Sequence, residues 1–176
     1  MNKPRIIVLL ILIVAAVALR FLPQPPNFTP IAALALFSGI FIRNRLWAVA
    51  APLGVMLITD LFIGLHSTML FVYGSFILMV WLGGAIYPHI KAGYVAGGGI
   101  TGATLFFIIT NFGVWLTSST YPSTWDGLLS AYVAAIPFYH YMIISTLFYS
   151  AIFIGLFVYA EKWFPSIRED HDHASA

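Results

Sequence analysis

The polar residues that could carry chemistry are few, and most lie toward the ends of long apolar runs. Asp60 stands inside such a run, where an ionisable side chain is costly and suggests a functional site. Arg20 ends another run, and Asn111 lies inside a third. Asp60 either contacts a ligand or pairs with Arg20 and holds helices together, and the sequence leaves both interpretations open.

The candidate ligand-binding residues have polar or aromatic side chains and lie toward the same ends of these runs. They are Arg20, Asn27, Asp60, His66, Tyr73, Asn111, Trp115, Tyr121, Trp125 and His140. Aromatic rings in this set could stack on a flat solute, while Arg20, Asp60 and Asn111 orient its polar edge. Asp60 and Asn111 lie a few residues from the ends of their runs, which predicts a shared cavity with Arg20 at its rim.

Signatures of enzymes and metal sites are missing from the sequence. It contains no H-E-x-x-H, G-x-S-x-G or phosphate-loop motif, so we expect no catalytic residue, cofactor or metal. His171 and His173 flank an aspartate in the C-terminal tail, where a solvated tail is the simpler interpretation. An enzyme would need a second catalytic group within hydrogen-bond reach of Asp60 or His140.

The composition identifies the environment of these residues. Hydrophobic residues make up 61% of the 176 residues and charged residues 8%, against about 25% charged in soluble domains. The chain cannot cover a water-facing surface and is expected to lie in a lipid bilayer. It has no cysteine, which excludes disulfides and thiolate sites, and no basic patch of the kind that binds nucleic acid.

Apolar segments predict an all-α polytopic bundle of six transmembrane helices. The segments are 5–22, 30–42, 46–65, 69–87, 93–116 and 139–159. Residues 128–136 predict a short interfacial helix that ends before Pro137, and a single helix over 128–159 is the alternative. Residues 1–165 are expected to form one transmembrane domain, followed by a polar, mobile tail over 166–176.

The loop charges predict an orientation. Of the eight basic residues, seven fall on one side of the six segments and only Arg20 falls on the other. Because Lys and Arg are enriched in cytoplasmic loops, both termini are expected in the cytoplasm. The expected location is the inner membrane of the cell, as a multi-pass protein. A cleaved signal peptide is the alternative for the first segment, because Ala16-Val17-Ala18 resembles a cleavage site.

Two further patterns concern packing and the shape of the site. Gly93 and Gly97, like Gly98 and Gly102, are spaced i,i+4, which predicts a close helix contact inside the bundle or docking onto another membrane subunit. Leucine at position 97 or 98 is therefore expected to damage packing. The loop 22–30 contains four prolines, which predicts a stiff wall or lid over an outer cavity, or a plain connector.

Four stretches resemble an uncharacterised bacterial family of six-span membrane proteins. They are R-F-L-P-x-P-P-N-F-T-P-I from Arg20, D-L-x-x-G-L-H-S-T from Asp60, T-N-F-G-V-W from Thr110 and Y-V-A-A-I-P-F from Tyr132. The size and six spans are distantly similar to the substrate-binding S components of energy-coupling-factor vitamin transporters. That resemblance implies a vitamin-like solute bound near the outer face, and docking on a membrane coupling subunit that works with ATPases.

Two functions from different classes follow. The first is a small-solute-binding subunit for uptake, resembling an S component. The second is a structural or assembly subunit of a larger membrane complex, with no ligand pocket. A buried outer cavity of roughly 300–1,000 Å³ would favour the first function over the second.

Overall fold

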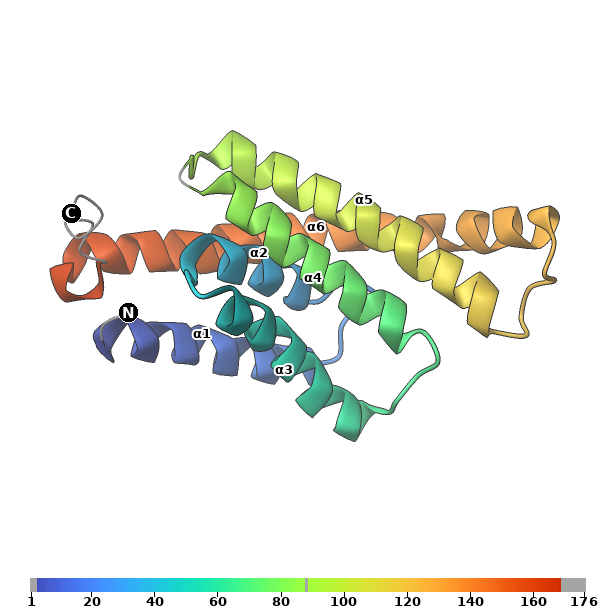
Figure 1. Ribbon diagram of the computed structural model, residues 1–176, viewed down its shortest axis with the longest axis horizontal. Coiled ribbons are helices and arrows are strands. Elements are labelled where there is room, and N and C mark those ends of the chain that lie inside the picture. Colours follow the sequence, from blue (N-terminus) through green and yellow to red (C-terminus); the bar gives the residue numbers. More distant parts are fainter. Residues whose placement is uncertain (1–2, 88, 169–176) are drawn as a thin grey trace.

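The computed structural model describes residues 3–87 and 89–168, and within them the chain is entirely helical (Figure 1). The six α-helices of these residues are α1 (Lys3–Arg20), α2 (Ile31–Phe41), α3 (Arg45–Ile63), α4 (Met69–Ile86), α5 (Ala92–Thr117) and α6 (Trp125–Trp163), followed by the 3-10 helix η1 (Pro165–Ile167). The prediction of an all-α chain with six helices is confirmed.

In the described part of the chain, four helices, α3 to α6, are long and apolar enough to cross a membrane. They make the protein a multi-pass membrane protein. The remaining two predicted spans are different in kind: α1 carries three basic residues in 18, and α2 is only 11 residues long. At about 1.5 Å per residue, α2 covers roughly 16 Å, about half of a hydrocarbon core of ~30 Å.

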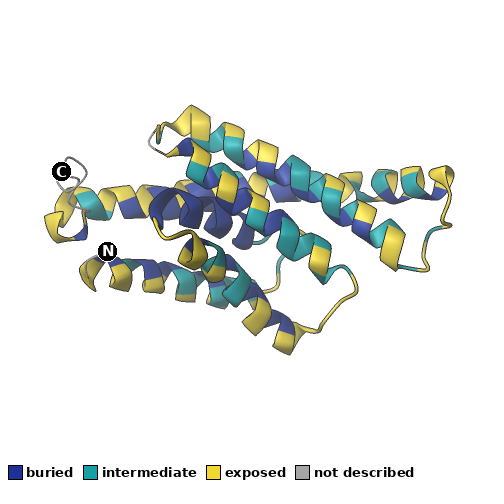
Figure 2. Cartoon of the chain, viewed as in Figure 1, coloured by how far each residue is buried: buried dark blue, intermediate teal, exposed yellow. Residues whose placement is uncertain are grey.

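The short helix α2 forms the centre of the molecule. All 11 of its residues are buried (Figure 2), and it packs mainly against α4, α3 and α6. A helix that is apolar on every side belongs in a core rather than at a surface. Aromatic rings surround its C-terminal half, with the ring centroids of Phe41 and Phe157 4.5 Å apart.

Glycines set the closest helix contact, which lies between α2 and α4. A Cβ atom on Gly39 would collide with the backbone carbonyl of Val80, and one on Gly83 would collide with the carbonyl of Leu36. Neither helix could approach its neighbour so closely with a larger residue at these positions.

The glycine-rich face of α5 divides into two halves. Gly98 and Gly102 pack against Ile86 and Met79 of α4, but a Cβ atom on Gly93 or Gly97 would meet no other atom within 4 Å. Position 97 therefore makes no close contact inside the bundle, because that side of α5 faces outward, and docking onto another membrane subunit stays the prediction for it.

Helix α6 runs without interruption over 39 residues, so the prediction of a separate interfacial helix before Pro137 is wrong. Pro137 lies on the exposed side of the helix. The other side is held along α5, where the hydroxyl of Tyr132 donates to the carbonyl of Ile108 and the hydroxyl of Tyr139 lies 2.7 Å from that of Thr104. Proline has no backbone N–H, so α6 lacks one backbone hydrogen bond at Pro137, and packing against α5 stabilises the helix there.

Both ends of the described chain lie at the same end of the bundle (Figure 1). Arg5 of α1 is only 4% exposed there; it donates to Glu161 of α6 at 2.6 Å and to the carbonyl of Phe41 at the end of α2 at 3.0 Å.

Arg5 also donates to the carbonyl of Ile167, which is itself buried. Residues 166–168, assigned to the tail from the sequence, thus pack against the bundle. Residues 169–176, with His171 and His173, lie outside the described residues.

Candidate functional site

The proline-rich connection between α1 and α2 packs against α6. The chain turns at Asn27, whose φ of 63° lies in the left-handed region, and the Asn27 carbonyl accepts from Ser145 of α6 at 3.2 Å. Phe28 packs beside Tyr149, with ring centroids 5.8 Å apart. Asparagine tolerates a positive φ better than most residues. These contacts fix the connection against α6 as a wall of the bundle.

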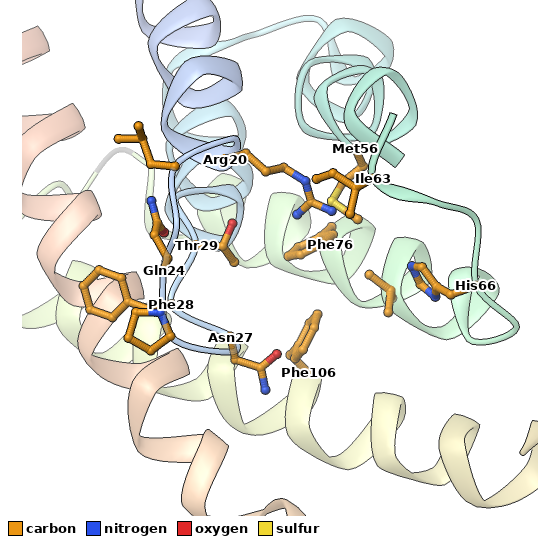
Figure 3. A pocket seen from close by; sticks show the side chains of 13 residues that line it. Arg20, Gln24, Asn27, Phe28, Thr29, Met56, Ile63, His66, Phe76 and Phe106 are labelled. Atoms are coloured by element: carbon orange, nitrogen blue, oxygen red, sulfur yellow. The ribbon is translucent and has the colours of Figure 1, made fainter. Parts of the chain in front are cut away.

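A cavity of about 370 Å³ lies where this connection meets α3, α4 and α5. Its wall includes Arg20, Asn27 and His66 from the predicted set, together with Thr29. Figure 3 shows these polar side chains around a common space, with the rings of Phe76 and Phe106 on another side. The cavity therefore combines a few polar groups with an apolar wall, as small-molecule sites do.

Arg20 and Asp60 form an ion pair at the edge of the cavity. Arg20 Nη2 lies 2.6 Å from Asp60 Oδ1, and the Tyr73 hydroxyl donates to Asp60 Oδ2 at 2.9 Å. Asp60 is 1% exposed, so both of its oxygens are satisfied out of contact with solvent. Asp60 does not itself line the cavity; it and Tyr73 hold the Arg20 side chain that does.

Two hydrogen-bonding groups around the cavity have no partner among the described residues. They are Arg20 Nε and Thr29 Oγ1, and both atoms are buried. Just beyond Thr29, α2 begins at Ile31 with no side-chain cap, so its first-turn N–H groups have no capping acceptor from a side chain. This end of the cavity thus has hydrogen-bonding groups that no described side chain satisfies.

His66 lies at the cavity wall and makes no hydrogen bond to Asp60. His66 Nε2 is 3.9 Å from Asp60 Oδ2, beyond hydrogen-bond distance, and His66 Nδ1 lies 2.9 Å from the hydroxyl of Thr68. Each Asp60 oxygen already accepts one hydrogen bond, from Arg20 or from Tyr73, and none comes from His66.

The other predicted ligand residues lie away from this cavity. The amide of Asn111 donates to the carbonyl of Phe107 on its own helix, and Trp115 Nε1 donates to the carbonyl of Pro122. Trp125 begins α6 and is 85% exposed, and His140 stacks against Tyr141 on an exposed part of the same helix.

Neither Asp60 nor Asn111 lines the cavity beside Arg20, so that cavity is not the one expected for them. Helix α5 has 26 residues and α3 has 19, and Figure 1 shows α5 reaching beyond the end of α3. An equal distance from the helix ends therefore does not mean an equal position along the bundle. Tyr121, in the loop after α5, is half-buried and likewise does not line the cavity.

Several residues of the cavity wall were not among the predicted site residues. Gln24, Thr29, Phe76 and Phe106 belong to this group. Thr29 and Gln24 could have been found from their place in the proline-rich connection, but the two phenylalanines are indistinguishable by type from those that pack in the core.

Residues 1–167 match a family of unknown function, DUF6580. The chain belongs to this family. No match was found among characterised proteins or among solved structures. The expectation of an uncharacterised membrane family is therefore confirmed for this DUF6580 chain, and these comparisons give no support for a similarity to S components.

Proposed function

We propose that the protein binds a small solute in the cavity beside Arg20 and Thr29, as the solute-binding subunit of an uptake system. The observation that carries the proposal is the cavity of about 370 Å³, on whose wall Arg20 and Thr29 each have one buried hydrogen-bonding atom without a partner among the described residues. Buried polar groups are normally satisfied, and an unsatisfied one requires an explanation. A bound solute with acceptor oxygens would satisfy both groups.

The surroundings favour a solute with a carboxylate or carbonyl group and a flat apolar part. Arg20 is positively charged, and the uncapped N-terminus of α2 adds a favourable field for negative charge. Phe76 and Phe106 offer the apolar surface for the remainder of the molecule. A vitamin-like aromatic acid has this combination of groups.

Binding rather than chemistry is the better proposal for this site. Asp60 is occupied by Arg20 and Tyr73, and His66 stands 3.9 Å from it. A catalytic acid or base needs a reachable proton partner, at about 2.6–3.2 Å or through one water. A chain of this size without an internal repeat is not a complete carrier. Uptake would therefore need a partner that supplies energy, and we propose a membrane coupling subunit with ATPases.

Solute binding can be tested on purified protein in detergent. Small molecules that copurify would be identified by mass spectrometry, and a panel of aromatic carboxylates, beginning with nicotinate and benzoate, would be screened by thermal shift and calorimetry. Thr29→Val keeps the shape of the side chain and removes its hydroxyl. Asn27→Gly removes the amide and still accepts the positive φ of 63°. Each should weaken binding about tenfold, the effect of one lost buried hydrogen bond.

Asn111→Ala is the matched control, because Asn111 is a polar residue bonded to its own helix away from the cavity. It should leave the affinity unchanged. A protein that retains no small molecule and responds to none of the panel would favour the structural-subunit function. Equal weakening by the control variant would show that the effect does not come from the cavity.

A further inference from the structure

A second cavity, far larger than a packing defect, lies between α1 and α3. It has a volume of about 560 Å³, and every residue that lines it is apolar. Helix α1 contributes the side from Ile6 to Val17, and α3 contributes the side from Trp47 to Ile58. We call this cavity the α1/α3 groove. In a bilayer, an apolar groove between helices is filled by a lipid acyl chain or by another apolar helix.

The length of the α1/α3 groove matches one leaflet. Ile6 and Val17, like Trp47 and Ile58, are eleven residues apart on their helices. Eleven residues rise about 16 Å in an α-helix, roughly half of a hydrocarbon core of ~30 Å. The groove therefore suits an acyl chain that enters from one surface and ends near the middle of the bilayer.

One end of the groove leads to a positively charged pocket. Ile42 lines both the groove and a small cavity of about 80 Å³ whose other walls include Arg43, Arg45 and Tyr87. Among the described residues, neither Arg43 nor Arg45 has an ion-pair partner, and no carboxylate lines this cavity. We call it the arginine pocket. Trp47, 65% exposed, stands at the same end, where tryptophan marks the headgroup level of a membrane.

A described carboxylate at the same end of the bundle, Glu161, does not neutralise Arg43 or Arg45. Glu161 is paired with Arg5 at 2.6 Å, and Arg5 also covers the carbonyl of Phe41 at the negative end of the α2 dipole. Among residues 3–87 and 89–168, no carboxylate offsets the positive charge that Arg43 and Arg45 give the pocket. Guanidinium groups bind phosphate oxygens with paired hydrogen bonds, so phosphate is the group that this pocket fits.

We propose that the α1/α3 groove and the arginine pocket together bind one anionic phospholipid. Its phosphate lies at Arg43 and Arg45, and one acyl chain follows the groove between α1 and α3. A transmembrane helix of a partner would also fill the apolar groove, but a phospholipid has both an acyl chain for the groove and a phosphate for the two arginines. Basic pockets beside transmembrane helices on the cytoplasmic side recognise anionic headgroups in this way. The proposal is independent of solute binding in the Arg20 cavity.

The test measures lipid retained by the purified full-length protein. Protein in detergent is titrated with dioleoyl phosphatidylglycerol or with dioleoyl phosphatidylcholine, which has the same chains, and bound lipid is counted by native mass spectrometry. The unchanged protein should retain one phosphatidylglycerol and prefer it over phosphatidylcholine by about tenfold or more. Arg43→Gln with Arg45→Gln should abolish most of this preference.

A second variant tests the groove itself. Gly54 lines the groove, and a Cβ atom there meets no other atom within 4 Å, so Gly54→Leu places its side chain in the path of the acyl chain. It should reduce retention of both lipids. Gly97→Leu is the matched control, because position 97 is equally open but lies on α5. Lys91→Gln with Lys162→Gln controls for the loss of two charges at the same end of the bundle.

Equal retention of the two lipids by the unchanged protein would overturn the proposal. So would losses of the same size in the control variants. If Gly54→Leu fails to fold, the double arginine variant still tests the same site through headgroup preference. A photo-crosslinker at Ala50 that captures a polypeptide while no phospholipid is retained would assign the groove to a partner helix and would also overturn the proposal.

Discussion

Asp60 illustrates how one buried carboxylate can support a site without belonging to its wall. Its oxygens are bound by Arg20 at 2.6 Å and Tyr73 at 2.9 Å, so three helices meet at this residue. The interpretation of Asp60 as a structural partner and the interpretation as part of a ligand site are thus compatible. Asp60 positions Arg20, and Arg20 faces the cavity.

Removing the charge of Asp60 should destabilise the protein. Asp60→Asn leaves the guanidinium of Arg20, 17% exposed, without its counter-ion. Breaking a buried ion pair costs about 3–5 kcal/mol, and the partial exposure of Arg20 places the expected loss near the lower figure. The measurement is the thermal unfolding transition in detergent.

Arg20→Gln combined with Asp60→Asn separates the two roles. The double variant should regain part of the stability, because no unpaired charge remains and the two amides can bond to each other. A single Asp60→Asn variant that is as stable as the unchanged protein would contradict the structural role of the pair.

At the scale of elements, the contact between α2 and α4 depends on glycine. Gly39 and Gly83 face the backbone of the opposite helix. Both helices are mostly apolar, and apolar side chains alone do not hold membrane helices together, because lipid tails are equally apolar. Close backbone contact is the remaining source of attraction.

Gly39→Ala should therefore weaken the bundle. The added methyl group would collide with the carbonyl of Val80, and the helices would have to separate. We expect a loss of about 1–3 kcal/mol, the usual cost of overpacking, measured as a lower unfolding temperature. Gly74→Ala on α4 is the control, since a Cβ atom there meets nothing within 4 Å. An equal loss of stability in both variants would contradict the role of the contact between α2 and α4.

The continuity of α6 can be tested by a distance. The chain has no cysteine, so Leu129→Cys with Leu156→Cys gives two spin-labelling sites, both of them exposed. A straight helix separates the labelled Cα atoms by about 40 Å, at ~1.5 Å per residue. Pulsed electron resonance should give a narrow distribution near this value. A broad or much shorter distribution would instead indicate a break at Pro137.

At the scale of the whole molecule, charge is distributed between the two ends of the bundle. The connections α2–α3 and α4–α5 lie at the same end as the start of α1 and the end of α6 (Figure 1). The eight basic residues follow this division, with only Arg20 at the opposite end. Lys and Arg are enriched in cytoplasmic loops, so this distribution predicts which end of the bundle faces the cytoplasm.

The end that carries both termini should therefore face the cytoplasm. Single cysteines at positions 44 and 90 should be protected from a membrane-impermeant thiol reagent in intact cells, while those at 25, 67 and 122 should react. Permeabilised cells provide the control, because all five sites should then be accessible. A strong signal at position 90 in intact cells would reverse the orientation.

Much of the helix pattern could be predicted from the sequence. The segment 69–87 differs from α4 (Met69–Ile86) by one residue, and the segment 46–65 differs from α3 (Arg45–Ile63) by at most two. These boundaries are set locally, by turn residues and by the length of each apolar run. The one large error was at Pro137, because the support that α6 receives from α5 is not visible in the local sequence.

Hydropathy determined that this chain lies in a membrane as a helical bundle, because 61% hydrophobic residues with 8% charged ones allow no other class. Only the tertiary structure decided that α2 is the buried centre, that Phe76 and Phe106 line a cavity, and that Gly97 faces outward. The physical reason is that lipid-facing and protein-facing side chains are equally apolar in a membrane protein. Position in the bundle is therefore set by long-range packing, not by residue type.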